Sequence, residues 1–130
     1  MKILQPPGWP RPKGYSNGIS AEGRLVFLAG QIGWGPEERV VCEDMAGQAR
    51  QALSNIVAIL AEGDAKPEHI VRMDWFVTDR NEYNASLKEI GAAYRELIGN
   101  HYPAMMAVEI SGLVEDGAKV EIEVTAVVPD

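Results

Sequence analysis

One stretch near the end of the chain decides the fold, Val120-Glu121-Ile122-Glu123-Val124-Thr125-Ala126. Apolar and polar residues alternate strictly along it, which predicts a β-strand with one buried and one polar face. The polar face carries Glu121 and Glu123, about 7 Å apart at the usual rise of a strand. At a solvated sheet edge these carboxylates would have no chemical role, and that is the simpler interpretation. In a half-buried cleft, one of them would act as a general acid or base.

Four further strands are expected outward from this stretch, at residues 15–20, 25–32, 70–78 and 102–110. The segment 25–32 is continuously apolar, which predicts a strand buried on both faces. The turn signal Ala21-Glu22-Gly23 predicts that the first two of these strands form a hairpin. Residues 1–13 contain four prolines and are expected to form an extended, irregular lead-in.

Two helices are expected between these strands, at residues 43–62 and 81–98. Apolar residues recur in both at spacings of three and four, and Gly63 and Gly99 follow as end signals. Asp79 is positioned to cap the second helix. The element order β-β-α-β-α-β-β predicts an α+β fold, a mixed sheet backed by two helices, in a single domain over residues 1–130. The uncovered sheet face predicts self-association.

Composition excludes several classes of function. The 130 residues carry a net charge of −7 with scattered cations, which disfavours a nucleic-acid partner. A single cysteine and the lack of a signal or spanning segment predict a cytoplasmic protein without a membrane partner. The two histidines, His69 and His101, are isolated, so no metal site is predicted.

A glycine-rich segment follows the strand at 25–32, Gly30-Gln31-Ile32-Gly33-Trp34-Gly35. It lacks the Lys-Ser/Thr pair of a phosphate loop. Two interpretations stay open: a tight strand exit, or backbone N–H groups exposed at the rim of a pocket.

Taken together, the segments around Gly14-Tyr15, Val26–Ile32, Gln48–Ile56, Tyr102-Pro103-Ala104 and Val120–Glu123 resemble the RidA/YjgF family of enamine/imine deaminases. The resemblance implies a fold like that of bacterial chorismate mutase. It also implies a homotrimer whose sheets form a central barrel, with three clefts between subunits. In active members, an arginine after Pro-Ala grips the substrate carboxylate. A glutamate on the last strand activates a water that attacks the imine carbon, which releases ammonia and a 2-keto acid without a metal or organic cofactor.

Two positions depart from the family pattern. Met105 occupies the arginine position and Ala29 the position of a serine, whereas Glu121 matches the catalytic glutamate and Tyr15 the pocket tyrosine. A thioether cannot form the bidentate bond that guanidinium makes with a carboxylate. The predicted pocket is therefore more apolar and suits a larger or less charged ligand, stacked on a tryptophan such as Trp34 or Trp75. Near Tyr15, the candidates for a replacement cation are Lys13 and Arg11.

Three hypotheses follow. The first is a trimeric imine deaminase of altered specificity, in which Glu121 handles the water, Gly30 offers backbone N–H groups, and Tyr15 shapes the pocket. Ala29, Trp34 and Met105 would complete the substrate site. The second is a non-enzymatic trimer that binds a small ligand or protects other proteins. The third, a chorismate-mutase-like enzyme, is disfavoured by the arginine-poor pocket, and fold alone does not license it.

Overall fold

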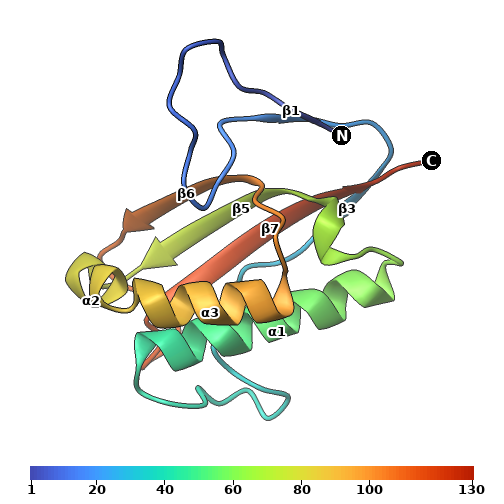
Figure 1. Ribbon diagram of the computed structural model, residues 1–130. Coiled ribbons are helices and arrows are strands. Elements are labelled where there is room, and N and C mark those ends of the chain that lie inside the picture. The colour runs from blue at the N-terminus through green and yellow to red at the C-terminus, as the bar shows by residue number, and fades with distance from the viewer.

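A mixed five-stranded sheet forms the centre of the protein in the computed structural model, which describes residues 1–130. The long strand β7 (Val120–Val128) pairs antiparallel with β5 (Ile70–Val77), and β6 (Ala104–Glu109) lies parallel to β5 (Figure 1). The other edge of β7 pairs antiparallel with two short strands, β3 (Arg24–Phe27) and β4 (Gln31–Ile32). The order is β3-β7-β5-β6, with β4 beside β7.

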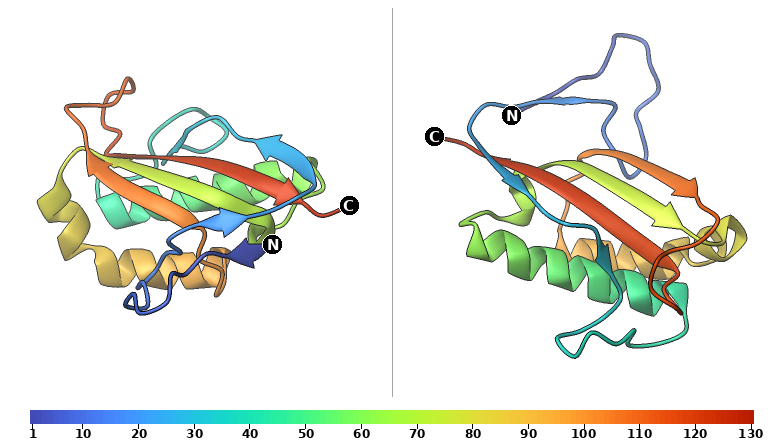
Figure 2. Two further views of the ribbon diagram at one scale, coloured as in Figure 1. Left: turned by 90° about the horizontal axis from the view of Figure 1, so that it is seen from above. Right: turned by 180° about the vertical axis from the view of Figure 1, so that it is seen from behind.

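Helices cover only one face of this sheet. They are α1 (Met45–Glu62), α2 (Arg80–Ala85) and α3 (Leu87–Leu97), with a 3₁₀ turn η1 at Pro67–His69. Seen from behind in Figure 2, α1 and α3 lie on one side of the sheet and the N-terminal loop on the other. The core forms between α1 and the sheet, where the apolar residues of both are fully buried. The predicted α+β fold is therefore confirmed.

The alternation along β7 is confirmed. Val120, Ile122, Val124 and Ala126 are buried, at most 1% exposed. On the opposite, helix-free face, Glu121 is half-buried and Glu123 is exposed. Gly63 ends the first helix as expected. The helix begins at Met45 rather than at residue 43, because Asp44 caps it, with its carboxylate accepting the Gly47 N–H at 2.9 Å.

The predicted hairpin between residues 15–20 and 25–32 is wrong. The first of these segments contributes only β2 (Ile19–Ser20), which pairs with β1 (Lys2–Ile3) inside the supposedly irregular lead-in. The second turns away at Gly23 and pairs with β7 instead. The physical reason is the length of the edge that each partner offers to β3. β7 pairs with all four residues of β3, whereas β2 has only two residues, and both of them pair with β1.

The expectation of one continuous strand at 25–32, buried on both faces, is also wrong. Leu25 and Phe27 are 58% and 72% exposed because their face of the sheet carries no helix. The strand is interrupted by a β-bulge. Phe27 pairs with Thr125 and Gln31 with Ile122, so four steps along one strand oppose three along the other.

The single helix predicted at 81–98 is divided at Ser86. This residue has φ −98° and ψ 1°, outside the helical region, and its N–H donates to the carbonyls of Glu82 and Tyr83. The Asp79 cap is present, with Asp79 Oδ1 accepting from the N–H groups of Asn81 and Glu82. The break reorients the chain, so that α3 runs beside α1 while α2 crosses the end of the sheet (Figure 1).

Candidate active site

The bulge between β3 and β4 brings Gly30 against the side chain of Glu121. A Cβ atom at position 30 would collide with Glu121 Oε2, so only glycine leaves the carboxylate in place. The register of β4 supports this placement, since Ile32 pairs with Glu121 itself. Of the two interpretations of the glycine-rich segment, this position at a pocket rim is the one the geometry favours.

A hollow of about 360 Å³ opens at this carboxylate, and we call it the Glu121 cavity. Its walls come from the β3–β4 segment, from β7 and from the loop before β7; they are Ala29, Gly30, Gln31, Ile32, Trp34, Val114, Glu115 and Glu121. The nearby Gln31 amide donates to Ala29 O at 3.1 Å rather than to the carboxylate. The Glu121 oxygens are therefore left for a ligand or a water.

Two amide side chains of α1 hold the loops around this cavity. Asn55 Nδ2 donates to Trp34 O at 2.8 Å and to Ile32 O at 3.3 Å. Gln48 is fully buried; it donates to Gly117 O at 2.9 Å and accepts the Lys119 N–H at 2.7 Å. Sequence reasoning missed both roles. The available signal was a polar residue placed among the apolar positions of a helix, which must find a partner when buried.

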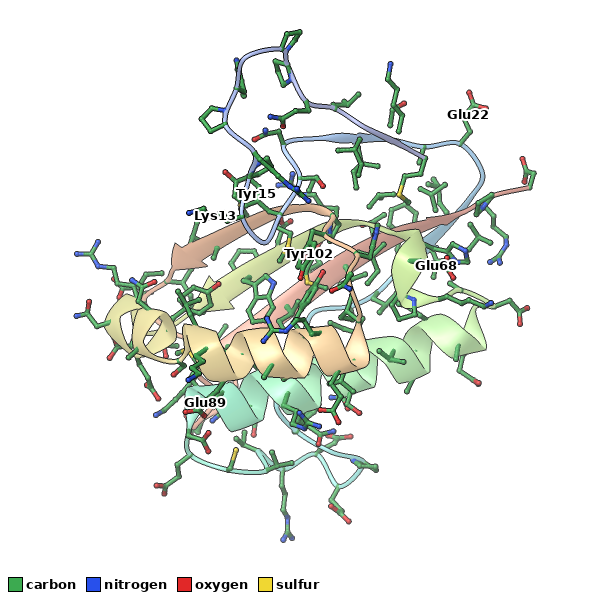
Figure 3. All side chains as sticks on the ribbon, viewed as in Figure 1. Lys13, Tyr15, Glu22, Glu68, Glu89 and Tyr102 are labelled. Atoms are coloured by element: carbon green, nitrogen blue, oxygen red, sulfur yellow. The ribbon has the colours of Figure 1, made fainter.

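Met105 lies in a different part of the chain, where β6 faces the N-terminal loop. Two hollows of about 270 and 350 Å³ adjoin there, and we call them together the Met105 cleft. They share five lining residues, Lys13, Gly14, Trp75, Tyr83 and Met105. Tyr15 lines the smaller hollow. Figure 3 shows Lys13 and Tyr15 at the base of the N-terminal loop above β6.

The inner wall of the Met105 cleft is aromatic and uncharged. Burial raises the pKa of the Tyr83 and Tyr94 hydroxyls, so both remain neutral at physiological pH. Tyr94 donates to His101 O at 2.5 Å and stacks on Tyr102 with ring centroids 5.4 Å apart. Tyr83 meets the Trp75 ring edge-on at 6.1 Å. These rings give the cleft a rigid apolar wall.

The predicted site residues therefore form two separate groups within one chain. Ala29, Gly30, Trp34 and Glu121 line the Glu121 cavity, whereas Tyr15 and Met105 line the Met105 cleft. The Glu121 cavity and the Met105 cleft share no lining residue. The two key side chains also point to different faces of the sheet, since Met105 pairs with the buried Met73 on the helix side and Glu121 lies on the helix-free side.

The remaining polar candidates have structural contacts. His101 Nε2 lies 2.6 Å from Ile70 O, and His69 Nδ1 accepts the Lys66 N–H at 3.0 Å. No group of three or more His, Cys, Asp and Glu side chains is arranged to hold a metal ion. None of the helices has the length and apolar character that a membrane span requires.

Comparison with known proteins agrees with this fold. The family model described as endoribonuclease L-PSP matches residues 10–128. A 2-iminobutanoate/2-iminopropanoate deaminase of Salmonella typhimurium is 35% identical over 116 residues, covering 87% of this chain and 86% of the relative. A RutC family protein of Pyrococcus horikoshii is 37% identical, with 90% of each chain covered.

Solved structures give the same result. A protein of unknown function from the conserved Rid family of Yersinia pestis superimposes with a TM-score of 0.84 at 26% identity, covering 98% of both chains. A putative translation initiation inhibitor from Vibrio vulnificus is 34% identical with a TM-score of 0.71, over 98% of this chain and 99% of the other. The chain therefore belongs to the endoribonuclease L-PSP family, the family also called RidA/YjgF.

Proposed function

We propose that this protein is a homotrimeric hydrolase that deaminates enamines and imines. Its substrate specificity is altered in favour of larger side chains. The observation that carries the proposal is the Glu121 carboxylate, half-buried on β7 and set against Gly30 at an open cavity. The relative from Salmonella typhimurium, named as a 2-iminobutanoate/2-iminopropanoate deaminase, supports the same type of reaction.

In the proposed reaction, Glu121 accepts a proton from a water as the water oxygen bonds to the imine carbon. The resulting carbinolamine carries nitrogen and oxygen on the same carbon. The imine reacts as its N-protonated form, so the C=N electron pair becomes the nitrogen lone pair of a neutral carbinolamine. Glu121 returns its proton to that nitrogen, and the C–N bond breaks with its electron pair leaving on ammonia. The Glu121 carboxylate then takes the hydroxyl proton as the carbonyl forms. Such general acid–base transfer typically contributes about 10²–10⁴ in rate.

A trimer would join the two groups of site residues that lie apart in one chain. The helix-free face of the sheet exposes Leu25, Phe27, Met106 and Val108, an apolar surface that favours burial against another copy. We expect a trimeric mass in solution by light scattering. We expect Phe27→Glu to yield monomers, whereas Ile59→Glu on the outer face of α1 leaves the trimer intact.

The position of Met105 supports the altered specificity. Guanidinium would bind a substrate carboxylate through two charge-assisted hydrogen bonds, and the thioether offers neither. The cleft around Met105 is instead lined largely by apolar and aromatic side chains. Small imino acids, which have little besides their carboxylate to bind, should therefore be poor substrates.

The deaminase proposal is tested by supplying imines from an amino acid oxidase and following the accelerated release of ammonia. Glu121→Gln is expected to lower the rate by about 10²-fold or more, because the amide cannot accept the proton. Glu123→Gln is the matched control, on the same face of the same strand but outside the cavity. Equal rates for wild type and Glu121→Gln, across imines of small and large side chains, would refute the proposal.

A second candidate function is a non-enzymatic trimer that binds a small ligand. The replacement of arginine by Met105 favours it, because the carboxylate clamp of active family members is missing. It predicts ligand-dependent increases in Tm with no ammonia release, since binding to the native state alone raises stability.

A further inference from the structure

We propose that the Met105 cleft binds the carboxylate of a 2-imino acid with a large, aromatic side chain, using the Lys13 ammonium and the Trp75 indole N–H in place of an arginine. This inference rests on the proposed function for its choice of substrate class, and it adds the groups that recognise the substrate. It departs from the family pattern, in which one residue at position 105 supplies the cation.

The first argument comes from Trp75. Its side chain is 2% exposed and lines both hollows of the cleft, yet its indole nitrogen is shielded from solvent without a hydrogen-bond partner. An indole N–H only donates, and a buried tryptophan normally finds an acceptor for it. Leaving such a donor unpaired costs stability. A ligand oxygen would satisfy it once the side chains that cover the nitrogen move aside on binding.

The second argument comes from charge. Two cations, Lys13 and Arg95, line the cleft, and no aspartate or glutamate does. Neither cation takes part in an ion pair within the chain. In a protein of net charge −7, a hollow with two unpaired cations and no acid selects an anion. In Figure 3 the acids Glu22, Glu68 and Glu89 all lie away from Lys13.

The structure also distinguishes the two replacement cations considered from sequence. Lys13 lines both hollows beside Met105. Arg11 lines only the neighbouring hollow of about 860 Å³, which shares Lys13 with the cleft but contains neither Met105 nor Trp75. Lys13 is therefore the residue placed to compensate for the thioether at position 105.

The third argument comes from the walls. Tyr83, Leu87, Ile90 and Tyr94 form one side of the larger hollow, and its volume of about 350 Å³ falls within the usual range of about 300–1,000 Å³ for ligand pockets. A two-carbon or three-carbon side chain would leave most of this apolar surface uncovered. A phenyl or indolyl side chain would bury it, and burial of apolar surface favours the larger ligand.

The test uses the 2-keto acid phenylpyruvate, the product expected from a phenylalanine-derived imine, which binds without turnover. Calorimetry of the full-length protein is expected to show phenylpyruvate binding about tenfold or more tightly than 2-oxobutanoate, and also than phenylacetone, in which methyl replaces the carboxylate. Lys13→Gln should weaken phenylpyruvate binding by about tenfold, the effect of losing one charged hydrogen bond. Lys88→Gln on α3, outside the cleft, is the matched control and should bind as wild type does.

The role of Trp75 is read from its indole N–H resonance in an ¹H–¹⁵N spectrum. Saturation with phenylpyruvate should shift this resonance and leave that of Trp9, which lies outside the cleft, nearly unchanged. Trp75→Phe assigns the signal. An unmoved Trp75 signal, or equal phenylpyruvate affinity for wild type and Lys13→Gln, overturns the inference.

The two proposals fail in different ways. Ammonia release that depends on Glu121, combined with phenylpyruvate binding indifferent to Lys13, would overturn this inference and leave the deaminase standing. Lys13-dependent binding without any ammonia release would support the binding groups and overturn the deaminase.

Discussion

The Glu121 cavity and the Met105 cleft differ in how they are built. Backbone geometry defines the first, since a β-bulge and a glycine that tolerates no Cβ fix the position of one carboxylate. Side chains define the second, where a loop lysine and an aromatic wall surround a thioether. By the resemblance to the family, the cavity keeps the glutamate but has Ala29 in place of a serine, and the cleft keeps Tyr15 but has Met105 in place of an arginine.

The difference indicates how specificity can change while a fold and a reaction type persist. Moving the Glu121 backbone would require rebuilding the strand register, because β4 and β7 pair directly at that residue. Replacing a side chain that lines the Met105 cleft alters which ligand fits and leaves the sheet intact. Substitutions in the two regions should therefore have different consequences, and the following predictions test that.

The largest expected effect is that of Gly30→Ala. The new methyl group would displace the Glu121 carboxylate, so ammonia release should fall by about 10²-fold, on the scale of a lost general base. Phenylpyruvate binding should change much less. Gly35→Ala is the control, because a Cβ there meets no atom within 4 Å. Full activity in Gly30→Ala would contradict the proposed position of the reacting carboxylate.

Met105→Arg should have an intermediate effect on specificity. It restores a bidentate partner for a carboxylate, so kcat/KM for 2-iminobutanoate should rise by about tenfold relative to a phenylalanine-derived imine. Ile59→Arg places the same charge on the outer face of α1, outside the cleft, and should leave the preference unchanged. If both variants keep the wild-type preference, Met105 does not contact substrate.

The smallest effect concerns the helix that supports the Glu121 cavity. Asp44→Ala removes the α1 N-cap and should lower the free energy of unfolding by about 1 kcal/mol without altering specificity. Urea denaturation measures the free energy of unfolding. Glu43→Ala, which removes a neighbouring carboxylate and leaves the Asp44 cap in place, is the control. An equal loss of unfolding free energy in Glu43→Ala and Asp44→Ala would show that the missing cap is not the cause.

The stabilisation of α1 by the Asp44 cap should also depend on pH. The Gly47 N–H, followed by the contact with Cys42, lowers the pKa of the Asp44 carboxyl below its ordinary value of 3.8. Because the pKa is lower in the folded state, the stabilisation is complete above pH 3.8 and is lost as the pH falls through the folded pKa. Wild type and Asp44→Ala should therefore converge in stability in strong acid.

Much of the fold could be predicted because its signals are local. The alternation of β7 and the apolar spacing of α1 each reflect burial on one face, and both predictions are confirmed. The errors came from competition between distant partners. Nothing within residues 15–32 indicates that β3 pairs better with β7 than with β2, and the break at Ser86 depends on how α3 packs beside α1.

The candidate site was predictable by residue type and not by arrangement. The sequence pointed to Glu121, Gly30 and Met105, but it did not indicate that they divide between two hollows with no lining residue in common. The unpaired indole nitrogen of Trp75 was also beyond sequence reasoning, because a missing hydrogen bond depends on three-dimensional surroundings. Residue identity sets what a group can do, and packing decides which groups meet.

The central claim, that a working site takes Glu121 from one copy and Met105 from another, is tested most directly by subunit mixing. Chains carrying Glu121→Gln and chains carrying Met105→Glu are co-expressed with different tags and purified as mixed trimers. Each parent should be inactive. In a cyclic trimer that contains both kinds of chain, one junction in three joins a native Glu121 to a native Met105, so the mixed trimers should restore about a third of the wild-type ammonia release. Mixed trimers no more active than either parent would contradict the account.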